Sequence, residues 1–322
     1  MKVLVVCSYK SYVSDGIAPF IKEQVETLRA LKIGDAGLEV EYYLLHGKGV
    51  FGYLKEIPTL RKKMREFKPD VIHAHFGLCG LLANIATRRV PVVVTYHGSD
   101  INDSHVYKFS KYAIRLSAWN IFVSRKNMEY AGFSNGKKCS LISCGVDDTL
   151  FVPMEKGECR RKLQEFGKWK EVEGKKYVLF TKQFFNIAKD YPLAKAAIER
   201  LDNVELLEFI GYTREESVLL INAVDALLMT SKTEGSPQVI KEAMACGCPI
   251  VSVDVGDVKE RINCIDGCYV AQTREPEELA KLLRKAFAFE GKTNGREVLT
   301  TQNLSNQLIA KQLIEIYQRV KN

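Results

Sequence analysis

Runs of apolar residues along the chain alternate with stretches in which apolar residues recur every three or four positions. Continuous apolar runs are typical of strands buried on both faces, whereas the wider spacing is typical of amphipathic helices. The alternation predicts an α/β protein with largely parallel sheets. The strand-like runs occupy residues 2–8, 38–45, 71–75, 92–96, 119–124, 177–182, 204–211, 225–231, 248–254 and 268–271.

The alternation stops once, near residue 150, and then starts again. The stretch 147–174 is rich in charge and contains no strand-like run. A chain of 322 residues also exceeds the usual size of a single core. We therefore predict one Rossmann-like domain over 1–150 and a second over 151–303, each binding ligands at the C-terminal ends of its strands. Residues 304–322 have helical spacing, and we expect this last helix to pack back toward the first domain.

Composition indicates the cellular compartment and the class of the protein. The chain contains no apolar run of 18 residues, and its N-terminal apolar run is too short for a signal peptide, so neither a membrane span nor a leader is predicted. The nine cysteines form no regular framework, which favours reduced thiols and a cytoplasmic protein. No cofactor motif follows the first strand, since G-x-G-x-x-G is absent there.

The net charge of +8 is unevenly distributed. Residues 1–150 hold 21 Lys and Arg against 14 Asp and Glu, so most of the excess lies in the first half. Such an excess indicates an anionic partner, either acidic lipid, a phosphate-bearing acceptor or nucleic acid, unless it is only a solvated surface. Nucleic acid is disfavoured because no aromatic motif is interleaved with the basic residues.

The segment 231–249, SKTEGSPQVIKEAMACGCP, places two glutamates around a predicted helix N-terminus. Glu234 precedes the helix, and Glu242 lies more than one turn inside it. The backbone N–H groups of 235–238 would face an anion, because the first N–H groups of a helix lack partners within it. Carboxylates suit vicinal diols, so the pattern fits a diphosphate that joins a sugar and a ribose.

Six segments, taken in chain order, resemble motifs of the retaining GT-B glycosyltransferases of family four. They are GIAPFIKEQVETL, DVIHAHFGLCG, VVVTYHGSD, LISCGVDDTLFVP, EGSPQVIKE and ACGCPIVSVDVGDV. The fifth is similar to the family's motif of two glutamates separated by seven residues. The resemblance covers nearly the whole chain and implies a GT-B fold, in which two Rossmann-like parallel-sheet domains face a central cleft.

The resemblance implies roles for residues of the second domain. Glu234 would contact hydroxyls of the donor sugar, and Glu242 would bind the ribose diol. The donor pocket would also be lined by Gly235, Ser236 and Pro237.

The family also places a basic pair, usually Arg and then Lys, on the donor diphosphate. Lys189 matches the lysine, whereas Lys182 or Gln183 occupies the place of the arginine. Tyr212 lies where the family holds the nucleobase.

In the first domain, the loop at Gly16 would let the backbone approach the donor diphosphate. His97 matches the family's histidine beside the reacting sugar, which makes it a catalytic candidate with Glu234 and Lys189. His75 and Asp100 are expected on the acceptor side.

His73 is predicted to be structural. The three histidines at these strand ends lack a fourth metal ligand, and no D-x-D motif is present, so we predict no metal site and no cofactor.

Residues 46–68 combine apolar Val50, Phe51 and Tyr53 with a run of basic residues. This composition resembles a peripheral contact with an anionic membrane. The alternative is an acceptor loop followed by a solvated helix. A membrane contact would put the protein at the inner face of the cell membrane.

These inferences predict a metal-independent retaining transferase for polysaccharide biosynthesis. It would move a hexose from a nucleotide diphosphate sugar to a hydroxyl of a glycan or glycolipid. Two other functions fit the same resemblance: a nucleotide-sugar epimerase with the same fold, and a non-catalytic glycan- or lipid-binding protein.

Overall fold

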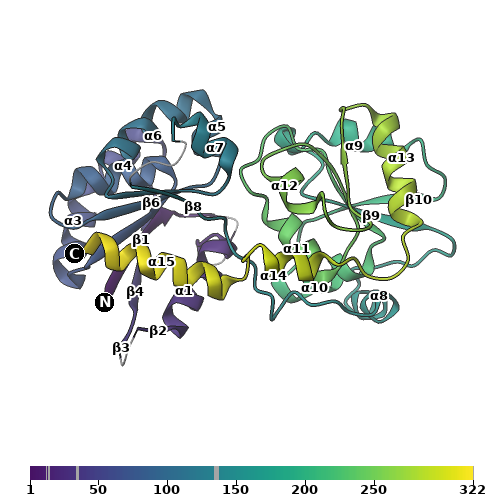
Figure 1. The fold of residues 1–322 in the computed structure, drawn as a ribbon, viewed down its shortest axis with the longest axis horizontal. Helices are drawn as coiled ribbons and strands as arrows, with labels where there is room; N and C mark the ends of the chain where they lie inside the picture. Colours follow the sequence, from purple (N-terminus) through teal and green to yellow (C-terminus); the bar gives the residue numbers. More distant parts are fainter. Residues whose placement is uncertain (12, 14, 34–35, 134–137, 322) are drawn as a thin grey trace. The chain divides into compact units, whose positions relative to one another are not determined.

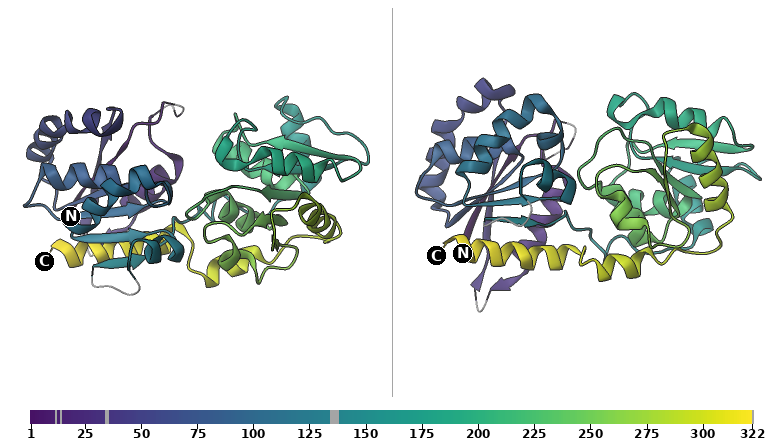
Figure 2. Two further views of the ribbon diagram at one scale, coloured as in Figure 1. Left: turned by 90° about the horizontal axis from the view of Figure 1, so that it is seen from above. Right: turned by 45° about the horizontal axis from the view of Figure 1, so that its top comes forward.

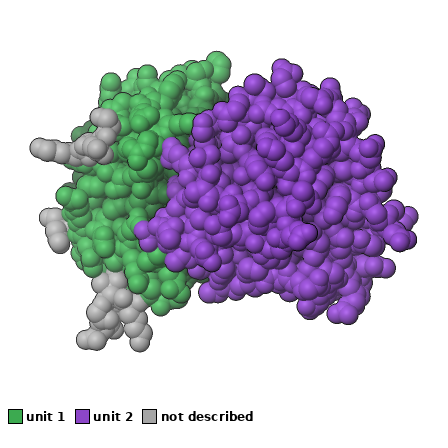
Figure 3. All heavy atoms as spheres, turned by 45° about the vertical axis from the view of Figure 1, so that its right-hand side comes forward, with its two compact units in different colours: residues 1–145, 306–322 green, residues 146–305 purple. Residues whose placement is uncertain are grey.

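The computed structural model describes residues 1–322 except 12, 14, 34–35, 134–137 and 322 (Figure 1). The chain divides into two compact units, coloured separately in Figure 3. Unit 1 comprises residues 1–145 and 306–322, and unit 2 comprises residues 146–305. Each unit contains one parallel sheet covered by helices, so the predicted α/β fold class with two parallel-sheet domains is confirmed.

The sheet of unit 1 has the strand order β4-β1-β5-β6-β7-β8, with all neighbours parallel. A short antiparallel pair, β2 and β3, lies outside it. The elements of unit 1 are β1 (Lys2–Ser8), α1 (Pro19–Ala30), β2 (Lys32–Ile33), β3 (Ala36–Gly37), β4 (Glu39–Leu45), α2 (Gly49–Leu54), α3 (Ile57–Phe67), β5 (Val71–His75), α4 (Gly77–Ala86), β6 (Val92–Tyr96), α5 (Ser99–Asn102), α6 (Ser104–Leu116), β7 (Trp119–Phe122), α7 (Arg125–Tyr130), β8 (Cys139–Leu141) and α15 (Asn306–Lys321).

The side chains of β1 divide between two hydrophobic clusters because successive side chains of a strand point to opposite faces. Val3 and Val5 pack in the cluster that contains α1 and α15. Leu4 and Val6 pack in the cluster that contains α3 and α4. The last helix, α15, runs along the same face of the sheet as α1 (Figure 1, Figure 2).

The sheet of unit 2 has the order β10-β9-β11-β12-β13, again with parallel neighbours. One large hydrophobic cluster fills the unit. Its elements are α8 (Lys156–Glu165), β9 (Lys176–Phe180), η1 (Ile187–Lys189), α9 (Tyr191–Ile198), β10 (Val204–Glu208), α10 (Arg214–Ala223), β11 (Ala226–Met229), α11 (Gln238–Cys246), β12 (Ile250–Val253), α12 (Val258–Ile262), β13 (Tyr269–Ala271), α13 (Pro276–Phe287) and α14 (Gly295–Thr301).

The predicted strands 71–75 and 92–96 have the bounds that the structure gives β5 and β6. The predicted strand 119–124 ends earlier, at Phe122, because the Ser124 hydroxyl accepts from Asn127 N–H and caps α7. Strand β8 was not predicted, since it is three residues long, half-buried and lies at the edge of its sheet. Within the described residues, none of the helices has the length and apolar character needed to cross a bilayer.

His73 ties the centre of the first sheet to the last helix. Its Nε2 is 2.8 Å from Thr95 Oγ1 on β6, and its Nδ1 is 2.6 Å from the Tyr317 hydroxyl on α15. All three side chains are buried. Burial lowers the pKa of His73 to about 3, because the interior disfavours the charged imidazolium. This geometry fits the predicted structural role of His73.

The lowered pKa of His73 predicts a pH-dependent stability of unit 1. Below the ordinary pKa of 6.5 the unfolded chain binds a proton at this ring and the folded chain does not. The unfolding free energy should therefore fall as the pH is lowered from 6.5, by about 1.4 kcal/mol per pH unit from this group. Urea unfolding should be measured at several pH values between 7 and 5, and the unfolding free energy plotted against pH. Below pH 6.5 the slope of this plot should be smaller by that amount in His73→Asn than in wild type.

Exposed His105 provides the matched control, and His105→Asn should keep the wild-type slope. Equal slopes in wild type and His73→Asn would contradict the assignment of a neutral, buried His73.

Candidate functional site

Two loops of unit 2 meet because their strands are neighbours in the sheet. Phe180, at the end of β9, pairs with Leu228 on β11. The loop after β9 leads to η1 and Lys189, and the loop after β11 contains Glu234. The Lys189 ammonium group donates a hydrogen bond to Glu234 Oε1, and the two side chains are only 20% and 15% exposed. The structure thus joins two of the three predicted catalytic residues in one ion pair.

Lys182 supplies a second ammonium group near this pair. Its pKa is lowered by partial burial of the ammonium group and then by the charge of Lys189, while Glu234 raises it. The charges of both members of the ion pair thus act on Lys182, although the residue as a whole is exposed. The position of the second cation was expected to hold Lys182 or Gln183. Lys182 is the one of the two that carries a positive charge and could bind an anion.

Side chains that the sequence did not single out hold the η1 turn in place. Thr230 Oγ1 donates to the carbonyl oxygens of Lys189 and Asp190 at 2.8 and 3.0 Å. Arg274 donates to the carbonyl oxygens of Thr230 and Ser231 and to Asp190 Oδ2. The position of Lys189 is thus determined by Thr230, which follows β11, and by Arg274, which precedes α13. No local sequence pattern predicts these contacts.

The loop before α11 is braced from the following βα loop. Ser236 Oγ donates to Asp257 Oδ2 at 2.6 Å, and Arg261 Nε donates to the same oxygen at 2.8 Å. Gly256, at φ 57°, packs so tightly that a Cβ would lie 2.5 Å from the Gly235 carbonyl oxygen. Only glycine fits there, and the sequence analysis missed this position and Asp257.

Helix α11 begins at Gln238, with Pro237 as its N-cap. Pro237 offers no side chain to cap the helix, and the first turn contains no acidic residue. An N-cap side chain normally accepts from one of the first N–H groups of a helix. The predicted donor-binding residues Gly235, Ser236 and Pro237 therefore lead into a helix end suited to an anionic group.

Glu242 is buried rather than solvated, with its side chain 3% exposed. Its Oε1 accepts from Arg214 Nη1 at 2.8 Å, and the Arg214 guanidinium lies 4.7 Å from the centre of the Phe151 ring. Arg214 is the first residue of α10 and was missed by the sequence analysis. The signal available was the capping box that starts at Thr213, which places Arg214 at a helix start.

Tyr212 lies just before this capping box, on the loop after β10. Lys168 Nζ is 5.3 Å from the centre of its ring, and the same ammonium group donates to Glu216 and to the Gly211 carbonyl oxygen. Tyr212 and Arg214 thus belong to one loop end, beside the Glu242 carboxylate. This loop is where the resemblance expects the nucleobase and the ribose.

In unit 1, the pairing of β5 with β6 brings the predicted histidines together. His75 pairs with Thr95, two residues before His97. His75 Nδ1 lies 3.0 Å from His97 Nε2, and the two rings are stacked with centroids 5.2 Å apart. His97 Nδ1 also lies 3.6 Å from Cys144 Sγ. The sequence predicted a shared strand edge but not direct contact between these rings.

The burial of His75 determines how this pair is protonated. Burial lowers its pKa well below the usual value, and the neighbouring His73 and His97 lower it further. Among the described residues, the buried Nε2 of His75 has no hydrogen-bond partner. An unpaired N–H would be costly there, so we assign the proton of the neutral His75 ring to Nδ1, which donates to His97 Nε2. A neutral His97 then carries its own proton on Nδ1.

Asp100 has a bracing role in the structure, in contrast to the expected contact with an acceptor. Its Oδ1 accepts from the N–H groups of His97 and Gly98 at 2.9 and 3.0 Å, and its Oδ2 accepts from Gly77 N–H at 2.9 Å. Burial raises the pKa of Asp100 to about 6, and these backbone donors partly oppose the rise. Because the side chain is 2% exposed, it fixes the loop that carries His97.

Gly16 lies in the loop after β1, three residues before α1 begins at Pro19. It has a φ of 74°, and a Cβ would lie 2.2 Å from two atoms of the Tyr9 ring. Both facts demand glycine. The predicted role of this loop toward a diphosphate stays a prediction.

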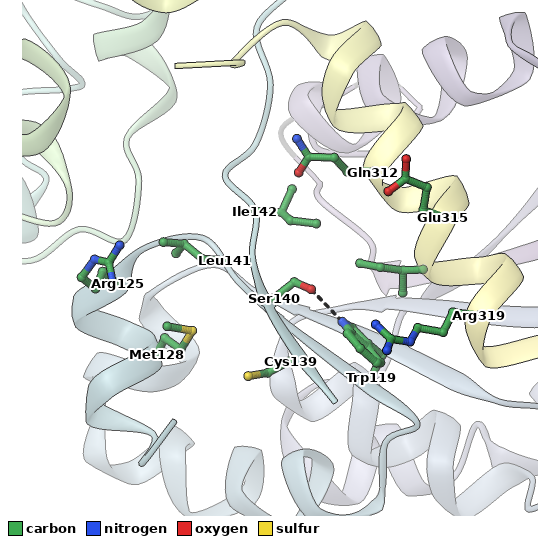
Figure 4. Close-up of a pocket in the computed structure, with 11 residues that line it drawn as sticks. Trp119, Arg125, Met128, Cys139, Ser140, Leu141, Ile142, Gln312, Glu315 and Arg319 are labelled. Carbon is green, nitrogen blue, oxygen red and sulfur yellow. Dashed lines mark hydrogen bonds between the residues drawn. The ribbon is translucent and has the colours of Figure 1, made fainter. Parts of the chain in front are cut away.

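Two cavities lie away from these residues. One cavity of about 560 Å³ in unit 1 lies between the edge strand β8 and the last helix, α15 (Figure 4). In its wall, Arg319 of α15 stacks on the ring of Trp119. Another of about 720 Å³ in unit 2 lies at the N-terminal ends of strands, beside Lys176, Asp225 and Pro249. Neither is lined by a predicted site residue. In the described part of the chain, no three His, Cys, Asp or Glu side chains converge as metal ligands.

Comparison with known families gives two matches along the chain. Residues 24–150 match the model of Glycosyltransferase Family 4, and residues 179–288 match the model of Glycosyl transferases group 1. The two ranges together cover most of the chain.

Curated relatives are distant in sequence. TuaC of Bacillus subtilis, whose name provisionally assigns it as a teichuronic acid biosynthesis glycosyltransferase, is 28% identical over 227 residues, which are 61% of this chain and 56% of TuaC. The amylovoran biosynthesis glycosyltransferase AmsK of Erwinia amylovora is 25% identical over 332 residues, covering 91% of this chain and 78% of AmsK.

Solved structures share the whole fold. Sucrose-phosphate synthase from Thermosynechococcus elongatus superimposes with a TM-score of 0.77 at 15% identity, covering 99% of this chain and 98% of that one. Anabaena HepE in complex with UDP-glucose superimposes with a TM-score of 0.72 at 17% identity, covering 98% of this chain and 99% of HepE. At these identities the likeness establishes the GT-B fold.

Proposed function

The chain belongs to the family-four, group-one glycosyltransferases of GT-B fold, and we propose that it moves a hexose from a nucleotide diphosphate sugar to a hydroxyl of a glycan or lipid-linked glycan. The observation that carries the proposal is the Lys189–Glu234 pair, with Lys182 on the same loop as Lys189, next to the N-terminus of α11. This arrangement combines cations for a diphosphate with a carboxylate for sugar hydroxyls.

The leaving group of the proposed reaction is a nucleoside diphosphate. Its developing charge would be stabilised by Lys189, by Lys182 and by the first N–H groups of α11, with the loop at Gly16 as a further contact. Groups held in place before the reaction lower the barrier most, because they need no reorganisation. The contacts of Thr230, Arg274 and Asp257 support that condition for Lys189 and Ser236. No metal ion is needed in this scheme.

The pairing of Glu234 bears on the stereochemical course. A retaining glycosidase uses a carboxylate nucleophile about 5 Å from a second carboxyl group. The Glu234 carboxylate instead holds the Lys189 ammonium group, which lowers its reactivity as a nucleophile. We therefore favour attack by the acceptor on the same face as the leaving diphosphate, with retention of the anomeric configuration. Glu234 would orient the sugar through its hydroxyls.

The Arg214–Glu242 pair supports a role in holding the nucleoside. The buried carboxylate pairs with Arg214, and its remaining acceptor positions suit the two ribose hydroxyls. Tyr212 supplies an aromatic surface on the same loop end. His97 would exchange its weak contact with Cys144 Sγ for a hydrogen bond from Nδ1–H to the donor sugar, and His75 would shape its surroundings.

The acceptor side of the proposal rests on unit 1. The side chain of Phe51 on α2 is 83% exposed, and Lys62 and Arg65 are exposed on the adjoining helix α3. This combination supports a peripheral contact with an anionic membrane. One relative, from Campylobacter jejuni, is named as a transferase that acts on a diphospho-undecaprenol-linked sugar, and such an acceptor would be reached at a membrane surface.

Thermal unfolding with nucleotides tests the proposed donor. UDP, GDP, ADP and their hexose conjugates should be added singly, each with the nucleoside monophosphate as control. One diphosphate series should raise the Tm, because a ligand of the folded state at about 100 times its Kd adds about 2.7 kcal/mol. Transfer to acceptor should then persist in EDTA. Absence of any nucleotide effect would contradict the proposal, and isomer formation from donor alone would indicate an epimerase.

The Glu234→Ala substitution should reduce kcat/KM of transfer by an amount equivalent to roughly 2–4 kcal/mol, as for the loss of one transition-state contact. It removes both the sugar contact and the partner of Lys189. Glu199→Ala, on a carboxylate that is 62% exposed and pairs with Lys195, is the matched control and should keep wild-type kinetics. The measurement is steady-state kinetics of sugar transfer. A wild-type kcat/KM in Glu234→Ala would contradict the assignment of Glu234 to the donor sugar.

The Glu242→Gln substitution keeps the shape of the side chain and removes the charge that binds Arg214. If Glu242 holds the ribose, the donor KM should rise about tenfold or more with a smaller change in kcat, since one charged hydrogen bond contributes about 1.5–3 kcal/mol. The measurement is donor titration at saturating acceptor. An unchanged donor KM would exclude the ribose role, provided that the circular dichroism spectrum is also unchanged.

A further inference from the structure

Phe76 has a backbone conformation that favours glycine. It follows His75 at the end of β5 and has φ 74° and ψ 146°. A Cβ makes this region costly, so a residue other than glycine persists there only when its surroundings hold it. Glycine at this position would remove the strain. The presence of phenylalanine at a position that favours glycine therefore points to a use of its ring that offsets the cost in stability.

The ring of Phe76 packs against the imidazole of His97. The two ring centroids are 4.6 Å apart at an interplanar angle of 46°. Phe20 adds a second aromatic contact at 4.9 Å, and the stacked ring of His75 adds a third at 5.2 Å. The His97 ring is thus bounded by three rings, while Asp100 holds its backbone N–H.

A purely structural role for Phe76 fits the observations less well. The side chain is only partly buried and packs at the margin of both hydrophobic clusters of unit 1. Lys10 Nζ also lies 5.4 Å from the centre of its ring. A residue that only filled the core would not need a strained backbone to reach a polar cluster of histidines.

We propose that Phe76 is a positioning residue, whose strained backbone sets its ring against His97 and thereby fixes the plane of the imidazole. The hydrogen bond from His75 would then determine the tautomer, and Phe76 would keep the ring plane in which the Nδ1–H group lies beside Cys144 Sγ. The inference rests on the proposed role of His97 toward the donor sugar. It adds a residue that acts on His97 rather than on the substrate.

The strain is tested by comparing Phe76→Gly with Phe76→Ala, since both variants remove the ring and only glycine accepts the backbone conformation. At an ordinary position glycine is the less stable of the two. Here we expect the Tm of Phe76→Gly to exceed that of Phe76→Ala by about 2–4 °C. A Tm of Phe76→Gly equal to or below that of Phe76→Ala would overturn the claim of strain.

The positioning role is tested by kinetics and by NMR of the imidazole nitrogens. Phe76→Gly should lower kcat about 10- to 100-fold with little change in donor KM, because the binding groups of unit 2 are intact. Phe76→Tyr keeps the ring and should retain wild-type kcat, whereas Phe76→Leu keeps the bulk and should not. Wild-type kcat in Phe76→Gly would overturn the role.

The NMR experiment separates this inference from the proposed function. With ¹⁵N-labelled histidine, the Nδ1 and Nε2 signals of His97 should report one tautomer in wild type and Phe76→Tyr. In Phe76→Gly the freed ring should turn away from His75 Nδ1 and lose the hydrogen bond that selects the tautomer, which would give averaged signals. This result is expected whether or not the wild-type protein transfers sugar. Unchanged His97 signals in Phe76→Gly would overturn the inference, while an inactive wild type would count against the proposed function alone.

Discussion

The parallel pairing of adjacent strands is the constraint on which both candidate sites depend. In unit 2, β9 and β11 are hydrogen-bonded neighbours, so the loop with Lys189 and the loop with Glu234 leave the sheet side by side. In unit 1, β5 and β6 are neighbours in the same way, so His75 meets His97. Parallel strands end at a common edge, and residues far apart in the chain therefore converge there.

Charge balance explains why acidic residues surround a helix end that attracts anions. Each of the two glutamates of the motif has a basic partner, Lys189 for Glu234 and Arg214 for Glu242. A buried carboxylate without such a partner would be strongly destabilising. Each pair places a cation against its carboxylate, and the first turn of α11 contains no acidic side chain.

Buried aspartates hold the loops of both units. Asp100 accepts from three backbone N–H groups around His97, and Asp257 accepts from Ser236 and Arg261 beside α11. Gly256 and Gly16 serve the same end through close packing that excludes a Cβ. Strain at Phe76 is tolerated within this rigid frame. The loops can therefore present polar groups in one geometry, as a site organised before substrate binding requires.

The sequence by itself determined the order of most strands and helices and the two-domain α/β architecture, because hydrophobic periodicity and the placement of glycine, proline and charge are local signals. It also indicated candidate site residues, whose roles stay predictions. It left the short edge strand β8, Arg214, Asp257 and the strain at Phe76 unseen. The tertiary structure alone decided that Glu242 is buried with Arg214, that Asp100 braces a loop, and that His75 contacts His97. These features depend on which strands become neighbours and which side chains exclude water, and both arise from contacts between residues distant in the chain.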